Sequence, residues 1–435
     1  MKSEKPNIIL MVADNLGMES VGYYDKSKMC KTPTLEKYLS GRLPRTPNLN
    51  KMAQEGVVFD NSYVCTPLCA PARCAWNTGR HAYRVGLNEL PDPNDPESGL
   101  SPKEVTIAKL LRDAGYYTAL FGKWHLGYDR KFNPLNFGFD EFYGSTAGHA
   151  DYYTHIYNKS GRRHFYRGFK PINDEGYFDK LFTDEAINFL ERMQKKGKLF
   201  YMNLCFYAPH GPYQTPPGYP WSEDADVNYR YMIEYLDKCV GRVIDKVDEL
   251  GFSENTLIVF LSDQGGSRTN GYDRTLWEPG IKVICNARWK GVIPEGTRVN
   301  TPWVHYDLYT TFAVLAGAKT PTDRVIDGQN IWPLFEGKEL KHDRTFHWTL
   351  KLKRRREDAI RIGDWKLHMT NGKVDGLFDL SKDPCEENDL SSDYPELTKK
   401  MQTIHDEWIR TCKAQQTSTA HSGKKYSNPN HNNGY

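Results

Sequence analysis

The sequence predicts an α/β protein built on a doubly wound sheet, with a small antiparallel sheet and one helix near its carboxyl end. Three observations predict this class. Four short apolar runs recur along the chain, segments with helical spacing lie between them, and after about residue 333 the pattern changes to short strands joined by turns. A chain of 435 residues is long enough for one large α/β domain and a smaller one.

The four apolar runs are the predicted strands of the large sheet. Each is nearly continuous, contains β-branched or aromatic residues and ends in polar residues, which is typical of strands buried on both faces of a parallel sheet. The runs are Ile8–Val12, Tyr116–Phe121, Leu199–Tyr207 and Leu257–Leu261.

Three segments between these strands are predicted helices. Val105–Ala114 stops at Gly115, a residue typical of helix ends. Thr183–Met193 begins with a threonine of the capping type, and Tyr229–Leu250 stops before Gly251. Alternation of strand, helix and strand predicts the doubly wound sheet.

The carboxyl-terminal part has a different pattern. Predicted strands cover residues 346–352, 359–367 and 374–380, with a turn at Asn371-Gly372. A helix over about 396–412 follows, and the Ser/Asn/His/Gly-rich end predicts a mobile tail. The predicted units are a large domain of residues 1–340, a small α+β subdomain of residues 341–413 and a tail of residues 414–435.

The composition argues against several classes of partner and site. A net charge of +3 is too close to neutral to indicate nucleic acid. The first apolar run is too short for a signal sequence or a membrane span, so we expect no membrane partner and either a cytoplasmic chain or one whose export signal has been removed. Nine cysteines include the group Cys65, Cys69 and Cys74 but no matching second pair, which disfavours zinc, and a chain this long disfavours a disulfide framework.

Polar residues directly follow the predicted strands. Because ligands bind outside the carboxyl ends of strands in open α/β sheets, these residues are predicted to share one rim. The acid–amide pairs Asp14-Asn15 and Asp263-Gln264 supply only oxygen ligands, which suit calcium or magnesium. Either pair alone is more simply explained by a turn or a helix cap, but two pairs at one rim favour a cation site.

Charged and titratable residues complete the predicted rim. Lys123 and His125 alternate along an extended segment, so both are predicted to face one cavity, the lysine toward an anion and the histidine for proton transfer. His210 stands between two prolines, and Arg73 and Arg80 are candidates to bind the same anion. The run of arginines at 354–356 is most simply a solvated turn, with contact to a second anionic group of a polymeric substrate as the alternative.

Several motifs together resemble the type I sulfatases, and in particular bacterial polysaccharide and arylsulfatase-like members. The most specific is Cys69-Ala70-Pro71-Ala72-Arg73 with Thr78-Gly79-Arg80 closing the segment. The others are the opening Pro6–Gly17, Gly122–Gly127, Pro209–Pro212, Ser262–Gly265, Ile362–Leu367 and Leu377–Leu380. The resemblance implies an alkaline-phosphatase-like fold, with a large mixed, mostly parallel sheet flanked by helices.

The resemblance also implies a mechanism. Cys69 would be converted to formylglycine by a formylglycine-generating or anaerobic sulfatase-maturating enzyme, and its hydrate would attack the sulfur of a sulfate ester. Calcium, with magnesium as the alternative, would be held by Asp14, Asn15, Asp263 and Gln264. The resemblance further implies that Lys123 neutralises sulfate, that His125 serves the hydrate and its deprotonation, that Arg73 holds formylglycine in place and that His210 protonates the leaving oxygen. It also implies substrate contacts for the loop of His149. Two arginines are further candidates for substrate binding: Arg80, named above as an anion ligand, and Arg274, as a substitute for a lysine that is usual in the family.

This chain departs from the family pattern at three places. Asn15 stands where many members have aspartate, which predicts weaker cation binding, and Asp273 stands where a sulfate-binding lysine is usual. The usual Glu-Gly-Gly is replaced by Glu278-Pro279-Gly280, and His149 lies in a loop linked to specificity. We expect a sulfated carbohydrate as substrate and a periplasmic or secreted location. A phosphonate or phosphate monoester hydrolase and an inactive glycan-binding relative are the alternatives; the sugar and the oligomeric state are not indicated.

Overall fold

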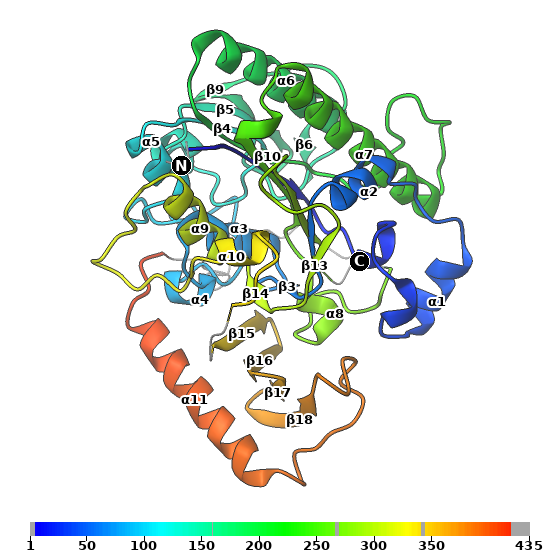
Figure 1. Ribbon diagram of the computed structural model, residues 1–435, viewed down its shortest axis with the longest axis vertical. Coiled ribbons are helices and arrows are strands. Elements are labelled where there is room, and N and C mark those ends of the chain that lie inside the picture. Colours follow the sequence, from blue (N-terminus) through cyan, green and yellow to red (C-terminus); the bar gives the residue numbers. More distant parts are fainter. Residues whose placement is uncertain (1–4, 159, 266–268, 341–343, 419–435) are drawn as a thin grey trace.

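A computed structural model of the chain describes residues 5–158, 160–265, 269–340 and 344–418. Its centre is a ten-stranded sheet that runs through the upper part of the molecule (Figure 1). In spatial order its strands are β13 (Thr297–Val299), β2 (Val57–Phe59), β12 (Cys285–Arg288), β11 (Thr256–Ser262), β1 (Asn7–Ala13), β10 (Phe200–Cys205), β4 (Tyr117–Lys123), β5 (Glu141–Ser145), β8 (Phe165–Arg167) and β9 (Lys170–Pro171). The five central strands are parallel, while β12, β8 and β9 run antiparallel to their neighbours.

The four predicted strands are confirmed as β1, β4, β10 and β11, which lie next to one another in the sheet. Strand β1 is buried along its whole length because both faces of the sheet are covered. Its side chains alternate: Ile8, Leu10 and Val12 join the core on one face, and Ile9 and Met11 join the core on the other. The predicted mixed, mostly parallel sheet is therefore confirmed.

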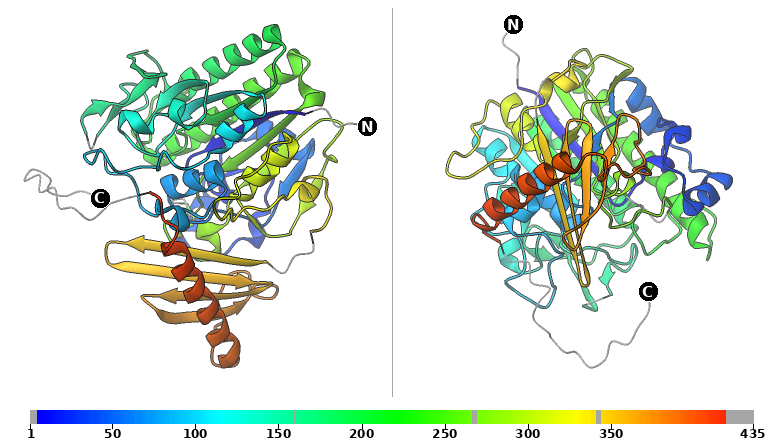
Figure 2. Two further views of the ribbon diagram at one scale, coloured as in Figure 1. Left: turned by 90° about the vertical axis from the view of Figure 1, so that its left-hand side faces the viewer. Right: turned by 90° about the horizontal axis from the view of Figure 1, so that it is seen from below.

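Helices form a layer on each face of this sheet (Figure 2). One core contains side chains of α2 (Pro47–Gln54), α6 (Phe178–Lys196) and α7 (Ala225–Glu249). The other contains side chains of α3 (Cys69–Thr78), α4 (Ala82–Val85), α5 (Ile107–Asp113), α9 (Asp307–Leu315) and α10 (Trp332–Phe335). The shorter elements are α1 (Pro33–Ser40), α8 (Glu278–Ile281), β3 (Ser62–Tyr63), β14 (Trp303–Val304), β6 (Ile156–Tyr157) and β7 (Arg162–Arg163).

A four-stranded antiparallel sheet and one long helix form the carboxyl-terminal part, as predicted. Its elements are β15 (Thr345–Leu352), β16 (Arg355–Ile362), β17 (Trp365–Thr370), β18 (Lys373–Asp379) and α11 (Pro395–Lys413). The single strand predicted over 359–367 is wrong, because Gly363 adopts a positive φ of 59° and turns the chain between two strands. Strand β15 contributes Trp348 to one core of the large domain, so the two parts share buried surface.

The first residues of the predicted tail, which begins at residue 414, are hydrogen-bonded to the large domain. The backbone N–H groups of Thr417 and Ser418 donate to the carbonyl oxygen of Val85, at 3.0 and 2.8 Å, and the Gln416 amide donates to that of Tyr83. These hydrogen bonds attach the segment that follows α11 to α4 of the large domain. The rest of the predicted tail, residues 419–435, lies outside the described residues.

One disulfide joins a segment near the start of the chain to one that follows the carboxyl-terminal sheet. Cys30, which follows the first strand, is bonded to Cys385, which follows the last, and seven further cysteines are buried and free. Cysteine spacing gave no sign of this pairing, because the two residues are 355 positions apart. Within the described part of the chain, every helix is either too short or too polar to cross a bilayer.

Candidate active site

The predicted rim residues lie where the central strands end. Asp14 follows β1, Asp263 follows β11 and Lys123 ends β4. Two backbone hydrogen bonds bind these ends together: the N–H of Asp14 donates to the carbonyl oxygen of Ala208 (3.1 Å), and the N–H of Asp263 donates to that of Ala13 (3.0 Å). The carboxyl ends of β1, β10 and β11 are thus held at one level.

Cys69 is the first residue of α3, and the amino-terminal end of that helix meets the rim. Its Sγ lies 3.6 Å from Asp14 Oδ1. Ligand atoms of Cys69, Asp14 and His210 all lie within 4.8 Å of one another. Burial, and then the charge of Asp14, raise the pKa of the Cys69 thiol. The encoded thiol is therefore protonated at neutral pH and a poor nucleophile in this environment.

Two buried ion pairs flank Cys69. The Arg73 guanidinium donates to Asp263 Oδ2 at 2.7 Å and to the carbonyl oxygen of Lys123 at 2.9 Å. The Lys123 ammonium pairs with Asp14. Burial, and then the charge of Asp14, raise the pKa of Asp263 to about 6. Two facing carboxylates are thus matched by two side-chain cations, which leaves the site close to neutral.

The amide side chains of the two acid–amide pairs point to a cation. Asn15 Oδ1 and Gln264 Oε1 are both buried, and neither has a hydrogen-bond partner in the described structure. Asn15 has a positive φ of 66°, and its backbone N–H donates to Asp263 Oδ1 at 3.1 Å. Since unsatisfied buried oxygens are costly, two of them beside two carboxylates fit the oxygen-only ligand set of a hard divalent cation.

His125 is held close to the two side-chain cations. Its backbone has a positive φ of 58°, and a Cβ added to Gly148 would lie 2.4 Å from the imidazole ring, so only glycine fits there. Burial, and then the charge of Lys123, hold the pKa of His125 well below its usual range. The ring is therefore neutral and can accept a proton.

His210 lies in the turn after β10, between two cis peptide bonds. Its Nδ1 is 2.7 Å from the carbonyl oxygen of Gly211. Because a carbonyl only accepts, Nδ1 carries the proton of the neutral ring and Nε2 carries the lone pair. Burial, and then the charge of Lys123, lower the pKa of His210 to about 4. The ring of His149 stacks on that of His210, with centroids 5.7 Å apart.

Asp179, a residue that the sequence did not single out, supports the turn that carries His210. It is fully buried in the first turn of α6, and its two oxygens accept the N–H groups of Tyr207 (2.8 Å) and Ala208 (3.1 Å). The carbonyl oxygen of Ala208 in turn accepts the N–H of Asp14. One carboxylate therefore anchors both a candidate metal ligand and the His210 turn. An acidic residue at a helix start is the available signal, but the sequence predicts Thr183 as the cap.

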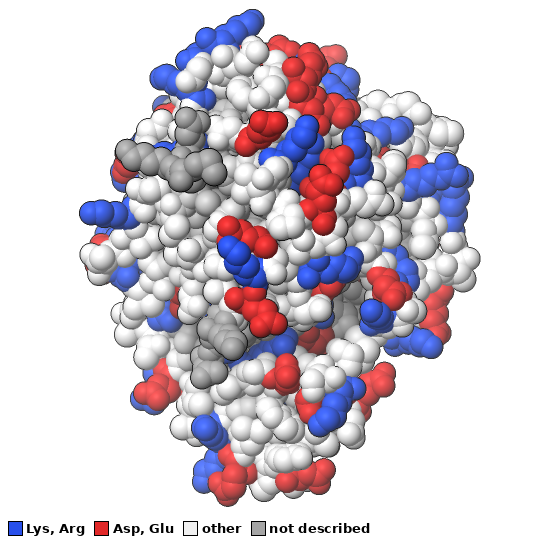
Figure 3. All heavy atoms as spheres, in the orientation of Figure 1, with Lys and Arg blue, Asp and Glu red and all other residues white. Residues whose placement is uncertain are grey.

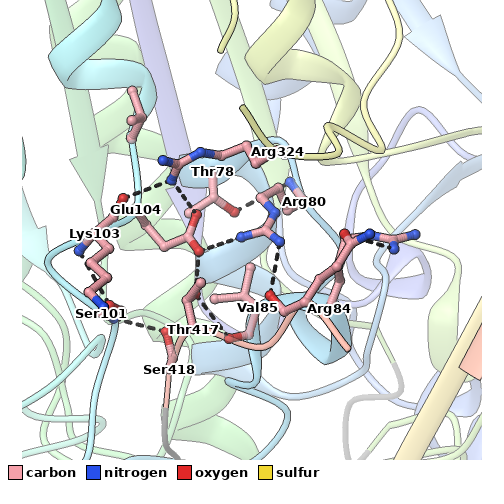
Figure 4. Close-up of polar contacts among 12 residues, drawn as sticks. Thr78, Arg80, Arg84, Val85, Ser101, Lys103, Glu104, Arg324, Thr417 and Ser418 are labelled. Carbon is pink, nitrogen blue, oxygen red and sulfur yellow. Dashed lines mark hydrogen bonds and ion pairs between the residues drawn. The ribbon is translucent and has the colours of Figure 1, made fainter. Parts of the chain in front are cut away.

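The structure does not bring Arg80 into this cluster. Arg80 is buried beyond the far end of α3, where its guanidinium pairs with Glu104 and donates to the carbonyl oxygens of Val325 and Gln415 (Figure 4). Its donors already have protein acceptors, so the structure places Arg80 apart from the other predicted anion ligands. Arg274 is half exposed, at 3.7 Å from Asp273, and its charge is one of the smaller causes that lower the pKa of His210.

Comparison with known proteins identifies the family. The sulfatase family model matches residues 6–318. N-acetylgalactosamine-6-sulfatase of Canis lupus familiaris is 31% identical, in an alignment that covers 84% of this chain and 72% of that protein. Human steryl-sulfatase is 28% identical, in an alignment that covers 94% of this chain and 89% of that protein. The chain belongs to the sulfatase family. The resemblance carried by the Cys69 motif is thereby confirmed, and the protein is a sulfuric ester hydrolase.

Solved structures extend the similarity to the whole fold of this sulfatase. The crystal structure of Ps i-CgsB is 29% identical, covers 96% of both chains and has a TM-score of 0.85. A second structure, Ps i-CgsB in complex with k-i-k-neocarrahexaose, has a TM-score of 0.83. The coverage includes the carboxyl-terminal sheet, so that sheet is part of the shared architecture.

Proposed function

We propose that this sulfatase hydrolyses sulfate esters of a sulfated carbohydrate, with formylglycine derived from Cys69 as its nucleophile. One observation carries the proposal: Cys69 begins a helix at a rim where two carboxylates are paired with two buried side-chain cations, and ligand atoms of Cys69, Asp14 and His210 lie within 4.8 Å of one another. As formylglycine, position 69 would supply a hydrated aldehyde whose two hydroxyl groups serve the attack on sulfur and the release of sulfate.

The surrounding side chains have distinct tasks in this proposal. Lys123 places an ammonium where negative charge develops on the sulfate oxygens. Arg73 braces position 69 from one helical turn further along α3, and His125, neutral and desolvated, accepts the proton of the hydrate. His210 acts on the leaving oxygen: because Nδ1–H is held by the carbonyl oxygen of Gly211, Nε2 is the atom that would take up a proton and pass it to that oxygen.

The cation site of this proposal consists of Asp14, Asn15, Asp263 and Gln264. Bound there, calcium, or magnesium as the alternative, would polarise the sulfate oxygens. Ion pairs with Arg73 and Lys123 hold the two carboxylates in place. With only two carboxylates among four oxygen ligands, the site is expected to bind the cation less tightly than one with aspartate at position 15.

A carbohydrate substrate and an oxidising compartment are supported by separate observations. Relatives include an N-acetylgalactosamine-6-sulfatase, and a similar structure was solved with a carrahexaose. The disulfide between Cys30 and Cys385 supports the periplasm or the cell exterior, since disulfides persist mainly in oxidising compartments. Maturation would then precede folding, because Cys69 is 7% exposed in the folded chain.

Peptide mass spectrometry combined with a release assay tests the proposal. The peptide containing Cys69 is expected to lose the mass that separates a thiol from an aldehyde. The converted enzyme is expected to release sulfate from sulfated oligosaccharides, and Cys69→Ala is expected to abolish release. Parallel assays with nitrophenyl sulfate and nitrophenyl phosphonate esters separate the sulfatase from a phosphonate hydrolase. Full turnover by Cys69→Ala would exclude the proposed nucleophile.

A further inference from the structure

A cavity of about 700 Å³ opens beside the catalytic rim. It begins at Gly17 and Gly265, which follow the two acid–amide pairs, and extends between α1 and α8, where the surface in Figure 3 is hollowed. Its volume lies in the range of ~300–1,000 Å³ that is typical of small-ligand sites. None of the roles proposed above uses this space.

Acidic side chains that line the cavity already have partners. Asp60 accepts from the Arg298 guanidinium. Glu278 is buried and pairs with the Lys366 ammonium at 3.0 Å, and it accepts from the Tyr63 hydroxyl at 2.6 Å. Glu278 therefore ties α8 to the carboxyl-terminal sheet instead of reaching the sulfate site. Amide side chains of Asn61, Asn270 and Asn300 also line the cavity.

Lys282 differs from these residues. It is half-buried in the cavity wall, and among the residues that the structure describes its ammonium has no hydrogen bond or ion pair. The carboxylates that act on it, Glu278 and Asp60, are the ones neutralised by Lys366 and Arg298. Burial lowers the pKa of Lys282, although Glu278 opposes the shift. A partly desolvated ammonium without a counter-ion is stabilised by an incoming anion.

A disulfide holds another part of the cavity wall in place. Cys30 and Pro384 both line the cavity, and the disulfide from Cys30 to Cys385 holds the loop before α1 against the carboxyl-terminal part. Lys28 stands at the mouth, with only a 3.9 Å contact to Asp25 and 82% of its side chain exposed. Pre-organised walls reduce the entropy lost on binding.

We propose that this cavity is a subsite for a second anionic group, carboxylate or sulfate, on the sugar next to the sulfated one, with Lys282 as its counter-ion. The inference rests on the proposed function, because it places an adjoining sugar beside the rim. The amides of Asn61, Asn270 and Asn300 suit the hydroxyl groups of that sugar. The enzyme would accordingly discriminate a polyanionic chain from an isolated sulfate ester.

Binding and turnover of matched variants test the subsite. The probes are a chondroitin 6-sulfate tetrasaccharide, whose neighbouring sugar bears a carboxylate, and κ-ι-κ-neocarrahexaose, whose neighbouring sugar bears a sulfate. Affinity is measured by calorimetry in a Cys69→Ala background, and turnover of 4-nitrophenyl sulfate is measured with converted enzyme. Lys282→Gln is expected to weaken binding of at least one probe about tenfold while aryl sulfate turnover stays within about twofold. Lys282→Arg is expected to retain affinity, and Lys290→Gln, at an exposed lysine, to change neither quantity.

The possible outcomes separate this inference from the proposed function. Unchanged affinity for both probes in Lys282→Gln, or failure of both probes to bind the parent, overturns the subsite while aryl sulfate turnover upholds the sulfatase. An equal loss of affinity and of aryl sulfate turnover also overturns it, because Lys282 would then act on the fold or on the rim. A converted enzyme that turns over no sulfate ester refutes the proposed function itself. The probe that responds identifies the anion.

Discussion

Asp179→Asn is predicted to lower turnover above about pH 7, where the Asp179 carboxyl is ionised in the folded chain, while leaving substrate affinity nearly unchanged. In the parent, each oxygen of the buried Asp179 carboxylate accepts one backbone N–H, from Tyr207 and from Ala208. An asparagine keeps the shape but offers one acceptor, so its own NH₂ group faces the other backbone donor. One backbone N–H of the turn that carries His210 then faces the NH₂ group of the asparagine and has no acceptor, whereas Lys123 and Arg73 stay in place.

The size of this effect follows from the hydrogen bond lost. A buried donor without an acceptor costs about 1–3 kcal/mol. If the turn keeps its place, the cost falls on stability and lowers the thermal midpoint by about 1–3 °C, given an unfolding entropy of roughly 2.1 cal/mol/K per residue in a chain this long. If the turn moves, the same free energy corresponds to a loss of about 5- to 150-fold in kcat.

Steady-state kinetics and thermal unfolding distinguish these two cases. A fall in kcat with KM unchanged is expected, because His210 acts on the leaving oxygen and the sulfate is held by other residues. Asp184→Asn is the matched control: it lies on the same helix, and its pairs with Lys180 and Arg242 are at the surface, worth about 0–1 kcal/mol. An Asp179→Asn enzyme with the parental kcat and the parental thermal midpoint would show that Asp179 does not hold the His210 turn in place.

Three further predictions concern stability. A chain ending after Lys413 is expected to be about 2 kcal/mol less stable than one ending after Ser418. It loses the hydrogen bonds to the carbonyl oxygens of Val85 and Tyr83 and the hydrogen bond from the Thr417 hydroxyl to Glu104. Equal denaturation midpoints of the two chains would contradict this. Cys30→Ser is expected to cost about 2–4 kcal/mol in unfolding free energy and to remove the cross-linked peptide from a non-reducing digest, and a parental digest without that peptide would disprove the disulfide. Burial raises the pKa of Asp179 to about 7, so between pH 4 and 7 the folded chain holds a proton that the unfolded chain releases. The contribution of Asp179 to the free energy of unfolding therefore falls as pH rises through that window. Asp179→Asn is expected to lack this fall when the free energy of unfolding is measured across pH.

The strand-end rim could be predicted because parallel strands bring their carboxyl ends to one edge. Asp14, Lys123, His210 and Asp263 are scattered along the sequence, yet each follows or ends an apolar run, and the sheet assembles them without any knowledge of the loops. Cys69 joins them because α3 begins at that residue, and Arg73 lies one helical turn further on the same side.

Other features depend on tertiary contacts that no local pattern reveals. Arg80 follows the end of α3, where Gly79 turns the chain with a φ of 68°; at 1.5 Å per residue it lies about 15 Å along the helix from Cys69. Thr183 is inside α6, which begins at the buried residue Phe178, and its hydroxyl donates to the carbonyl oxygen of Asp179 one turn earlier. The polar residues 415–418 are ordered by acceptors on α4, whereas their composition alone favours mobility.

Asn15→Asp is predicted to strengthen cation binding and to lower the stability of the cation-free protein. The Asn15 oxygen is buried and unpartnered, and its left-handed φ of 66° suits aspartate as well as asparagine. The two existing carboxylates are already matched by Lys123 and Arg73, so a third would have only the cation as its partner. Calcium affinity by calorimetry is therefore expected to rise about tenfold, while the thermal midpoint in chelator falls. Asn94→Asp, in an exposed turn, is expected to change neither value; an Asn15→Asp protein with parental calcium affinity and parental midpoint would show that Asn15 is not a ligand.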